Sequence, residues 1–323
     1  MVTYSKDGSE GGERESPPDS HWVLLFFKGV AMGAADVVPG VSGGTIAFIT
    51  GIYQRLLNAL KSLHPFSLRI LWREGFREFW RAIDGRFLLT LFSGVLVSIL
   101  SFARVIRYFL EYHPIMMWSF FFGLVLASIV FLVRQTPQWC LQEIVAVVLG
   151  ALIALGISML RPAQLPDEWW VMMFSGFIAI CAMILPGISG SFILLLMGMY
   201  SVFIQALSEL NVLLLVSFGV GCIIGLIVFS HLLSFLLHRY LSTMLAALTG
   251  LLIGSLNVLW PWKQIIETTV NRYGKVIPLV QENISPYSYE IVTGNSDQLA
   301  IAIVVFIVGF LIVFVLEKVN IKY

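Results

Sequence analysis

The sequence predicts an all-α integral membrane protein with two inverted repeats, each made of a re-entrant helical hairpin and three transmembrane helices. Hydrophobic residues make up 58% of the 323 positions and charged residues only 12%, against about 25% charged in soluble globular domains. Six apolar runs are long enough to cross a bilayer, and two longer runs are copies of each other. These three observations define the predicted fold class.

The balance of charge excludes one class of partner. With 20 Lys and Arg against 19 Asp and Glu, the chain has a net charge of +1 and no long basic segment, so no nucleic-acid partner is expected. The three cysteines, Cys140, Cys181 and Cys222, lie far apart in or beside apolar runs, which is typical of packing residues. We therefore expect no metal site and no cofactor, other than a coupling proton or sodium ion.

The chain begins with a polar segment, residues 1–21, in which we expect a disordered cytoplasmic tail. The six uninterrupted apolar runs that follow are expected to be helices. Lipid admits only helices or closed barrels, and none of the runs alternates in the manner of a barrel strand. The runs cover residues 87–110, 114–133, 142–160, 211–237, 241–260 and 299–316.

Two further apolar stretches, 22–60 and 169–207, are each 39 residues long. A single helix of that length extends about 58 Å, nearly twice the ~30 Å hydrocarbon core. Each stretch is interrupted at its middle, one by Pro39-Gly40 and the other by Pro186-Gly187, and a Ser-Gly cluster follows. Proline breaks the helical hydrogen-bond ladder and glycine permits a sharp reversal, so each stretch is predicted to be a helix-turn-helix hairpin with its turn at membrane depth.

The two hairpins align without a gap when each residue is laid over the residue 147 positions later. Eleven of 32 positions are then identical, namely Trp22, Phe27, Gly29, Ala35, Pro39, Gly40, Ser42, Gly43, Ile46, Gly51 and Tyr53 with their counterparts. This agreement predicts an internal duplication, with repeats at 22–160 and 161–323. Three spans follow each hairpin, so the second repeat starts on the opposite face of the membrane and the repeats are inverted.

Basic residues predict the orientation of the spans. With the N-terminus inside, twelve Lys and Arg residues fall in the inner segments, and only four, Arg161, Lys263, Arg272 and Lys275, fall outside. This distribution fits the positive-inside rule and predicts that both termini are cytoplasmic.

Two connecting segments are long, and the first of them, 61–86, has no counterpart in the second half. Residues 61–86 interleave aromatic, aliphatic and basic side chains, which predicts an amphipathic helix on the inner leaflet or a cytoplasmic cap packed on the bundle. Residues 261–298 form the longest loop and carry three prolines, so we expect an extracytoplasmic cap or lid.

The interrupted hairpins are the best candidates for a substrate site, because helix ends supply backbone groups at a depth where lipid otherwise forbids them. The candidate substrate-binding residues are those at the starts of the two half-helices, whose backbone amides attract an anion: Ser42, Gly43, Gly44, Thr45, Ser189, Gly190 and Ser191. A simpler interpretation is that small residues let membrane helices pack closely. The presence of two such clusters in one register favours the substrate site.

Charges within the apolar runs are further candidates. Arg104 and Arg107 share one face of the run 87–110 and are predicted to bind a phosphate, unless they extend toward the outer interface. Arg55, with Lys28, flanks the first hairpin and is predicted either to attract an anionic headgroup or to anchor the hairpin at the interface.

Asp36 is the candidate coupling residue. It lies three positions before Pro39, and its repeat counterpart is the neutral Met183. This asymmetry suits a proton or sodium site in one half, while the alternative role is to brace the hairpin.

The first motif, GAADVVPGVSGGTIAFITGIY over residues 33–53, resembles the signature of the bacterial polyprenyl-phosphate transporter family, the PopT-type undecaprenyl-phosphate translocases. The second motif, LPGISGS over 185–191 with MGMY at 197–200, is also similar. The resemblance extends over nearly the whole chain from residue 22.

This resemblance implies a flippase of the bacterial cytoplasmic (inner) membrane. It implies return of undecaprenyl phosphate from the outer to the inner leaflet, which recycles the lipid carrier for cell-envelope synthesis. The implied partners are the lipid phosphate and membrane lipids, and no oligomeric state is predicted.

Two alternatives differ in their chemistry. One is a secondary transporter of another anion. The other is an integral membrane polyprenyl-pyrophosphate phosphatase, whose Pro-Gly-x-Ser-Arg-Ser-Gly motif is similar to residues 39–44. Gly43 replaces the arginine of that motif, and no paired glutamates occur in the apolar runs, so the groups for hydrolysis are missing. The sequence therefore predicts that the protein is not an enzyme.

Overall fold

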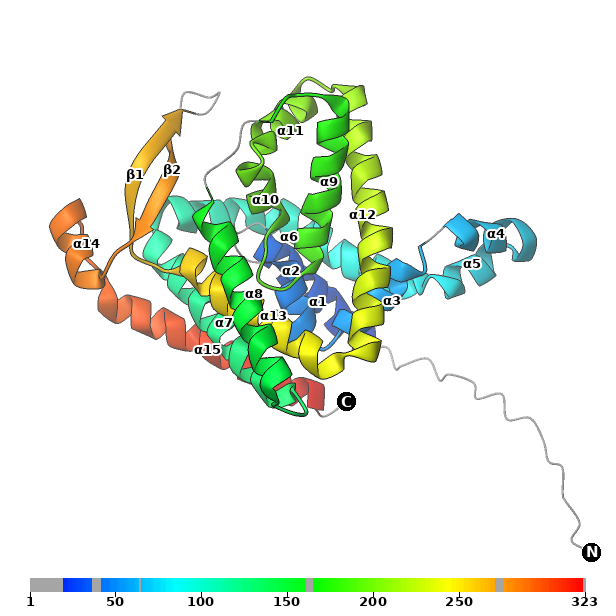
Figure 1. Cartoon of the computed structure of the whole chain (residues 1–323), viewed down its shortest axis with the longest axis horizontal. Coiled ribbons are helices and arrows are strands. Elements are labelled where there is room, and N and C mark those ends of the chain that lie inside the picture. Colours follow the sequence, from blue (N-terminus) through cyan, green and yellow to red (C-terminus); the bar gives the residue numbers. More distant parts are fainter. Residues whose placement is uncertain (1–19, 37–41, 64, 161–164, 271–275, 322–323) are drawn as a thin grey trace, which may run out of the picture.

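The computed structural model describes residues 20–36, 42–63, 65–160, 165–270 and 276–321, so most of the predicted tail lies outside the described residues. The fold is predominantly helical, as predicted (Figure 1). Six long helices lie on the six apolar runs: α6 (Gly85–Tyr112), α7 (Pro114–Gln135), α8 (Leu141–Met159), α12 (Val212–Arg239), α13 (Leu241–Leu259) and α15 (Leu299–Ile321). Within the described residues, α7, α8, α12 and α13 are each long and apolar enough to span a bilayer. Counting two bent helix pairs raises that number to six.

Each predicted hairpin contains a second break, so it consists of three helices. The first comprises α1 (Ser20–Asp36), α2 (Gly43–Ile49) and α3 (Tyr53–Lys61), and the second comprises α9 (Trp169–Ile184), α10 (Gly190–Leu196) and α11 (Met199–Ser208). The additional breaks fall at Gly51 and Gly198, which both have φ of 72°. Only glycine adopts that backbone conformation readily. These two glycines are counterparts in the 147-residue register, so the backbone repeats where the sequence does.

Helices α1 and α6 cross where two glycines face each other. A Cβ atom at Gly29 would overlap the carbonyl of Leu91, and a Cβ at Gly94 would overlap the carbonyl of Phe26. The crossing therefore requires glycine at both positions, because the two backbones are in contact.

The crossing of α9 and α12 repeats this arrangement. Gly176 faces the carbonyl of Phe218, and Gly221 faces the carbonyl of Met173. Gly176 and Met173 correspond to Gly29 and Phe26 of the first crossing, and Gly221 and Phe218 correspond to Gly94 and Leu91. The offset between counterparts is 147 residues from α1 to α9 and 127 residues from α6 to α12, because residues 61–86 lengthen the first half.

A second kind of crossing is duplicated in the remaining helices. Gly123 of α7 lies against the backbone of α15 at Phe306, and Gly309 of α15 lies against the backbone of α7 at Phe120. Gly250 of α13 and Gly150 of α8 make a crossing of the same kind. Helices α7 and α13, one from each of these two pairs, also contact each other. All six long helices thus take part in a packing pattern that occurs twice.

The two halves differ in burial. Every residue of α2 is buried, whereas only Gly190, Leu194 and Leu196 are buried in α10. The first hairpin therefore lies in the interior, and the second is more open.

Residues 61–86 form two short helices instead of one amphipathic helix. They are α4 (Pro65–Glu74) and α5 (Phe76–Ala82), and Gly75 between them has φ of 89°, which ends the first helix. Both helices project from the bundle beyond α3 (Figure 1). Trp72 is 88% exposed, and α5 buries no residue.

The predicted loop 261–298 contains regular structure, so the fold is not purely α-helical. Strands β1 (Lys263–Val270) and β2 (Val276–Asn283) form an antiparallel ribbon, and α14 (Pro286–Thr293) follows. The ribbon stands beside the helices in Figure 1. At its base the Trp260 indole donates to the Ile284 carbonyl (2.8 Å), and Lys263 Nζ lies 4.4 Å from the ring centroid of Trp118.

We predict that Lys263 makes stability depend on pH. Burial lowers the pKa of Lys263 to about 8, well below the value of an unfolded lysine. Between these two values the unfolded chain binds more protons, so the free energy of unfolding should rise as the pH increases from about 8 to 10. Thermal unfolding of wild type and Lys263→Met across this range measures the difference. If the difference stays constant with pH, the prediction is wrong.

We also predict that the duplicated crossings tolerate no side chain. Gly221→Leu should destabilise the protein by about 1–3 kcal/mol or prevent folding, because the side chain meets the Met173 backbone. Gly219→Leu, on the same helix, is the matched control, since no atom lies within 4 Å of its added Cβ. Unfolding midpoints of the purified proteins test the contrast, and equal stability of the two variants would contradict the crossing.

Candidate functional site

The turn of the second hairpin is held by side chains of the first. Ser42 Oγ donates to the Met183 carbonyl at 2.9 Å, and Tyr53 Oη donates to the Ile184 carbonyl at 3.0 Å. Met183 and Ile184 are the last residues of α9, where carbonyls have no partner within the helix. The first hairpin thus completes the hydrogen bonding of the second at its proline break.

In a third contact, the second turn is the donor and a side chain of α2 is the acceptor. The Gly187 amide donates to Thr45 Oγ1 at 3.1 Å, and both groups are buried. The Gly187 amide, which the break at Pro186 leaves without a helical partner, is therefore satisfied by a threonine of the first Ser-Gly cluster. We name these three hydrogen bonds the hairpin junction.

The first cluster is closed by its own hairpin. The Gly43 amide donates to Asp36 Oδ1 at 2.7 Å, and the Gly44 amide donates to Ser42 Oγ at 3.1 Å, so Ser42 caps α2. Ser42, Gly43, Gly44 and Thr45 are all buried. The amides proposed for an anion thus have protein acceptors in this conformation, and Asp36 links the end of α1 to the start of α2.

The second cluster is more accessible. Ser189 and Ser191 share a hydrogen bond of 2.9 Å between their hydroxyls, and Gly190 packs against the Ala179 carbonyl. Ser189, with Ser158 and Ser255, lines a small cavity of about 20 Å³ between the turn, α8 and α13. We name it the Ser189 cavity.

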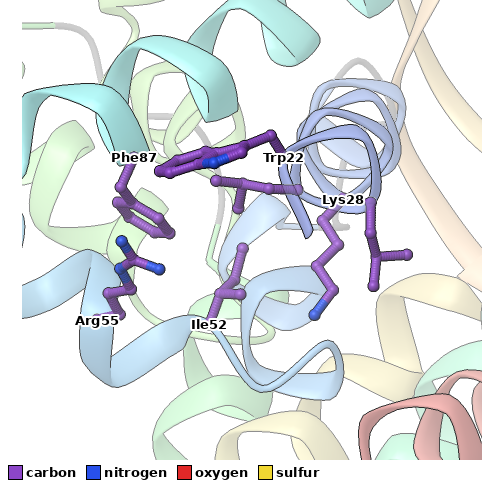
Figure 2. A pocket seen from close by; sticks show the side chains of 7 residues that line it. Trp22, Lys28, Ile52, Arg55 and Phe87 are labelled. Carbon is purple, nitrogen blue, oxygen red and sulfur yellow. The ribbon is translucent and has the colours of Figure 1, made fainter. Parts of the chain in front are cut away.

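A larger cavity of about 180 Å³ lies beside the first hairpin, and we name it the Lys28 cavity (Figure 2). It is lined by residues of α1, of the break between α2 and α3, of α3 and of α6, namely Trp22, Leu24, Leu25, Lys28, Ile52, Arg55 and Phe87. Lys28 Nζ donates to the Thr50 carbonyl at 2.7 Å.

Arg55 is held in this cavity by two contacts. Its Nε and Nη2 atoms donate to the carboxylate of Asp84 at 2.7 and 3.1 Å. Its guanidinium carbon lies 4.4 Å from the ring centroid of Phe87. Arg55 therefore belongs to the Lys28 cavity and makes no contact of the hairpin junction.

The structure brings together only part of the predicted site. Ser42 and Thr45 of the first cluster meet the second turn directly. Arg104 and Arg107 lie in α6, but their side chains are outside the described residues.

Sequence reasoning missed Tyr53 and Asp84. Tyr53 carried one signal, its identity with Tyr200 in the repeat. No sequence pattern connected Asp84 to Arg55.

Two interrupted helices that meet around buried polar groups, in a bundle of apolar helices, are typical of a multi-pass membrane transporter. The chain belongs to the undecaprenyl phosphate translocase-like family, because the family model described as VCA0040-like matches residues 32–277. A polyprenyl-phosphate transporter from Vibrio cholerae is 46% identical over 298 residues, which cover 92% of this chain and 97% of the relative. A polyprenyl-phosphate transporter from Staphylococcus aureus is 28% identical over 258 residues, which cover 74% and 86%. No solved structure matches the chain.

These relatives confirm the predicted family. Both are named as transporters, which agrees with the prediction of a protein that is not an enzyme and disfavours the phosphatase alternative.

We predict that the hairpin junction contributes to stability through Thr45. Thr45→Val keeps the shape of the side chain but leaves the buried Gly187 amide without its acceptor, which should cost about 1–3 kcal/mol. Thr249→Val is the matched control, because this buried hydroxyl only adds a bond to a carbonyl within its own helix. Unfolding of the purified variants measures both, and equal effects would contradict the role of the junction.

Proposed function

We propose that the protein moves undecaprenyl phosphate from the outer to the inner leaflet of the bacterial cytoplasmic membrane, where the carrier is used again for envelope synthesis. One observation carries this proposal. Ser42 and Thr45, from the start of α2, meet the end of α9 and Gly187 at the hairpin junction, and a cavity lies on either hairpin. Pro39 and Gly40 of the first motif lie outside the described residues.

A charged headgroup cannot cross the hydrocarbon core without polar partners, whereas a prenyl chain can stay in lipid. The proposed path supplies hydroxyls and backbone amides from both broken helices. The headgroup is predicted to pass between the Ser189 cavity and the Lys28 cavity through the junction, which must open for passage.

The proposed topology places the two cavities on opposite sides. With inverted repeats and both termini cytoplasmic, the Ser189 cavity faces the outer leaflet, and the Lys28 cavity faces the inner leaflet. The duplicated glycine crossings support the repeats, and the exposed aromatic side chains of α4 and α5 suit an inner-leaflet surface. The difference in burial between α2 and α10 is what one of two alternating states requires.

Asp36 provides a coupling mechanism within this proposal. Its carboxylate accepts the Gly43 amide, and a charged acceptor binds more strongly than a neutral one. Proton uptake by Asp36 weakens this bond and makes the Gly43 amide available to a phosphate. Proton and substrate binding are then linked, because each favours the same opened turn.

The proposal predicts a specific defect for Asp36→Asn. The asparagine oxygen can still accept from Gly43, but the side chain takes up no proton. In proteoliposomes with an imposed proton or sodium gradient, a leaflet-resolved assay of undecaprenyl phosphate should show exchange but no accumulation against the gradient.

Glu290→Gln, which neutralises an exposed carboxylate of α14, is the control and should behave as wild type. Accumulation by Asp36→Asn equal to wild type would leave Asp36 as a brace for the hairpin. Release of inorganic phosphate from the lipid by wild-type protein, without leaflet exchange, would overturn the transport proposal.

A further inference from the structure

We infer that the Lys28 cavity is a binding site for a phosphate monoester carried on a prenyl chain, with Lys28 and Arg55 as its cations and Asp84 as a competing anion. This inference rests on the proposed function and specifies where the headgroup binds at the inner leaflet.

The two cations approach the cavity from different walls. Lys28 extends from α1, Arg55 extends from α3, and Ile52 lies between them (Figure 2). A tetrahedral phosphate has oxygens on several sides, so cations on separate walls can bind it together. The repeat counterparts of these cations are Ser175 and Val202, so the second half has no equivalent pair.

Arg55 is oriented for such a ligand. Asp84 occupies Nε and Nη2, and the Phe87 ring supports the face of the guanidinium, so its plane is fixed. These bonds leave Nη1 for another acceptor, and a fixed planar fork suits the oxygens of a phosphate.

Asp84 can give way to a phosphate. The side chains of Arg55 and Asp84 are 46% and 38% exposed, and ion pairs with that degree of exposure contribute little. A phosphate with a second cation, Lys28, therefore competes with Asp84 for the Arg55 guanidinium.

The remaining walls indicate a lipid as the source of the phosphate. Trp22, Leu24, Leu25 and Phe87 make one part of the cavity apolar. On the same helix α1, Val23 and Phe27 are 59% and 60% exposed, which indicates a lipid-facing surface. A headgroup between the cations can thus have its prenyl chain on apolar walls that continue into lipid.

Farnesyl phosphate, a short prenyl phosphate, tests the site in full-length protein reconstituted in nanodiscs. Equilibrium binding of the radiolabelled compound should weaken by about tenfold or more in Lys28→Gln and in Arg55→Gln, because each removes a charged donor. Arg81→Gln, which breaks the exposed ion pair with Glu78, is the matched control and should bind as wild type. Farnesol, which lacks the phosphate, should bind equally to all four proteins.

Asp84→Asn should bind farnesyl phosphate several times more tightly than wild type. Asp84 has φ of 49° and ψ of 47°, a left-handed conformation that asparagine tolerates, so the backbone is preserved. A gain in affinity cannot result from misfolding, and a purely structural ion pair predicts no gain. Inorganic phosphate should compete only weakly.

The outcomes separate this site from the function. If Lys28→Gln and Arg55→Gln bind as wild type, or if Asp84→Asn shows no gain, the site is wrong, whatever the transport assay gives. If inorganic phosphate binds as tightly as farnesyl phosphate, the lipid assignment is wrong. If the variants behave as expected but wild type moves no undecaprenyl phosphate between leaflets, the proposed function fails and the phosphate site stands.

Discussion

The rest of the structure depends on satisfying the backbone groups of two broken helices inside an apolar bundle. A helix that ends in lipid leaves carbonyls and amides without partners, and each unpaired group is costly. The hairpin junction solves this problem by pairing the two breaks. The hydroxyls of Ser42 and Tyr53 donate directly to the last two carbonyls of α9. The Thr45 hydroxyl accepts a hydrogen bond from the Gly187 amide in the following turn. The break of the second hairpin is therefore satisfied by side chains of the first, whereas the Gly43 and Gly44 amides of the first are satisfied by Asp36 and Ser42 of the same hairpin.

The glycine crossings make this contact geometrically feasible. At each crossing the backbones approach so closely that a Cβ atom would overlap a carbonyl, as at Gly94 and at Gly221. A close crossing at glycine loses little side-chain entropy and gains much dispersion energy. This is how helices associate in lipid, which is as apolar as their side chains. The duplicated crossings thus form a scaffold in which the two interrupted hairpins contact each other.

The chemistry carried on this scaffold is not duplicated. Asp36, Lys28 and Arg55 in the first hairpin correspond to Met183, Ser175 and Val202 in the second. The first hairpin is also the more deeply packed, with Tyr53 buried and its counterpart Tyr200 exposed. The repeat accounts for two related breaks, whereas the charges belong to the first hairpin alone. In the proposed function, a headgroup meets hydroxyls at the second hairpin and cations at the first.

The sequence by itself determined the features that depend on local composition. Apolar length defined the spans, Pro39 and Pro186 defined the main breaks, and the two motifs identified the family, because each of these is a property of neighbouring residues. The breaks at Gly51 and Gly198 and the ribbon β1–β2 were not predicted, since a glycine in an apolar run and a long loop without apolar runs are each compatible with several backbones. The contacts that define the candidate site were decided by the tertiary structure. Tyr53 and Ile184 are 131 residues apart, and Arg55 and Asp84 are 29 apart, so only the packing of the helices brings each donor to its acceptor.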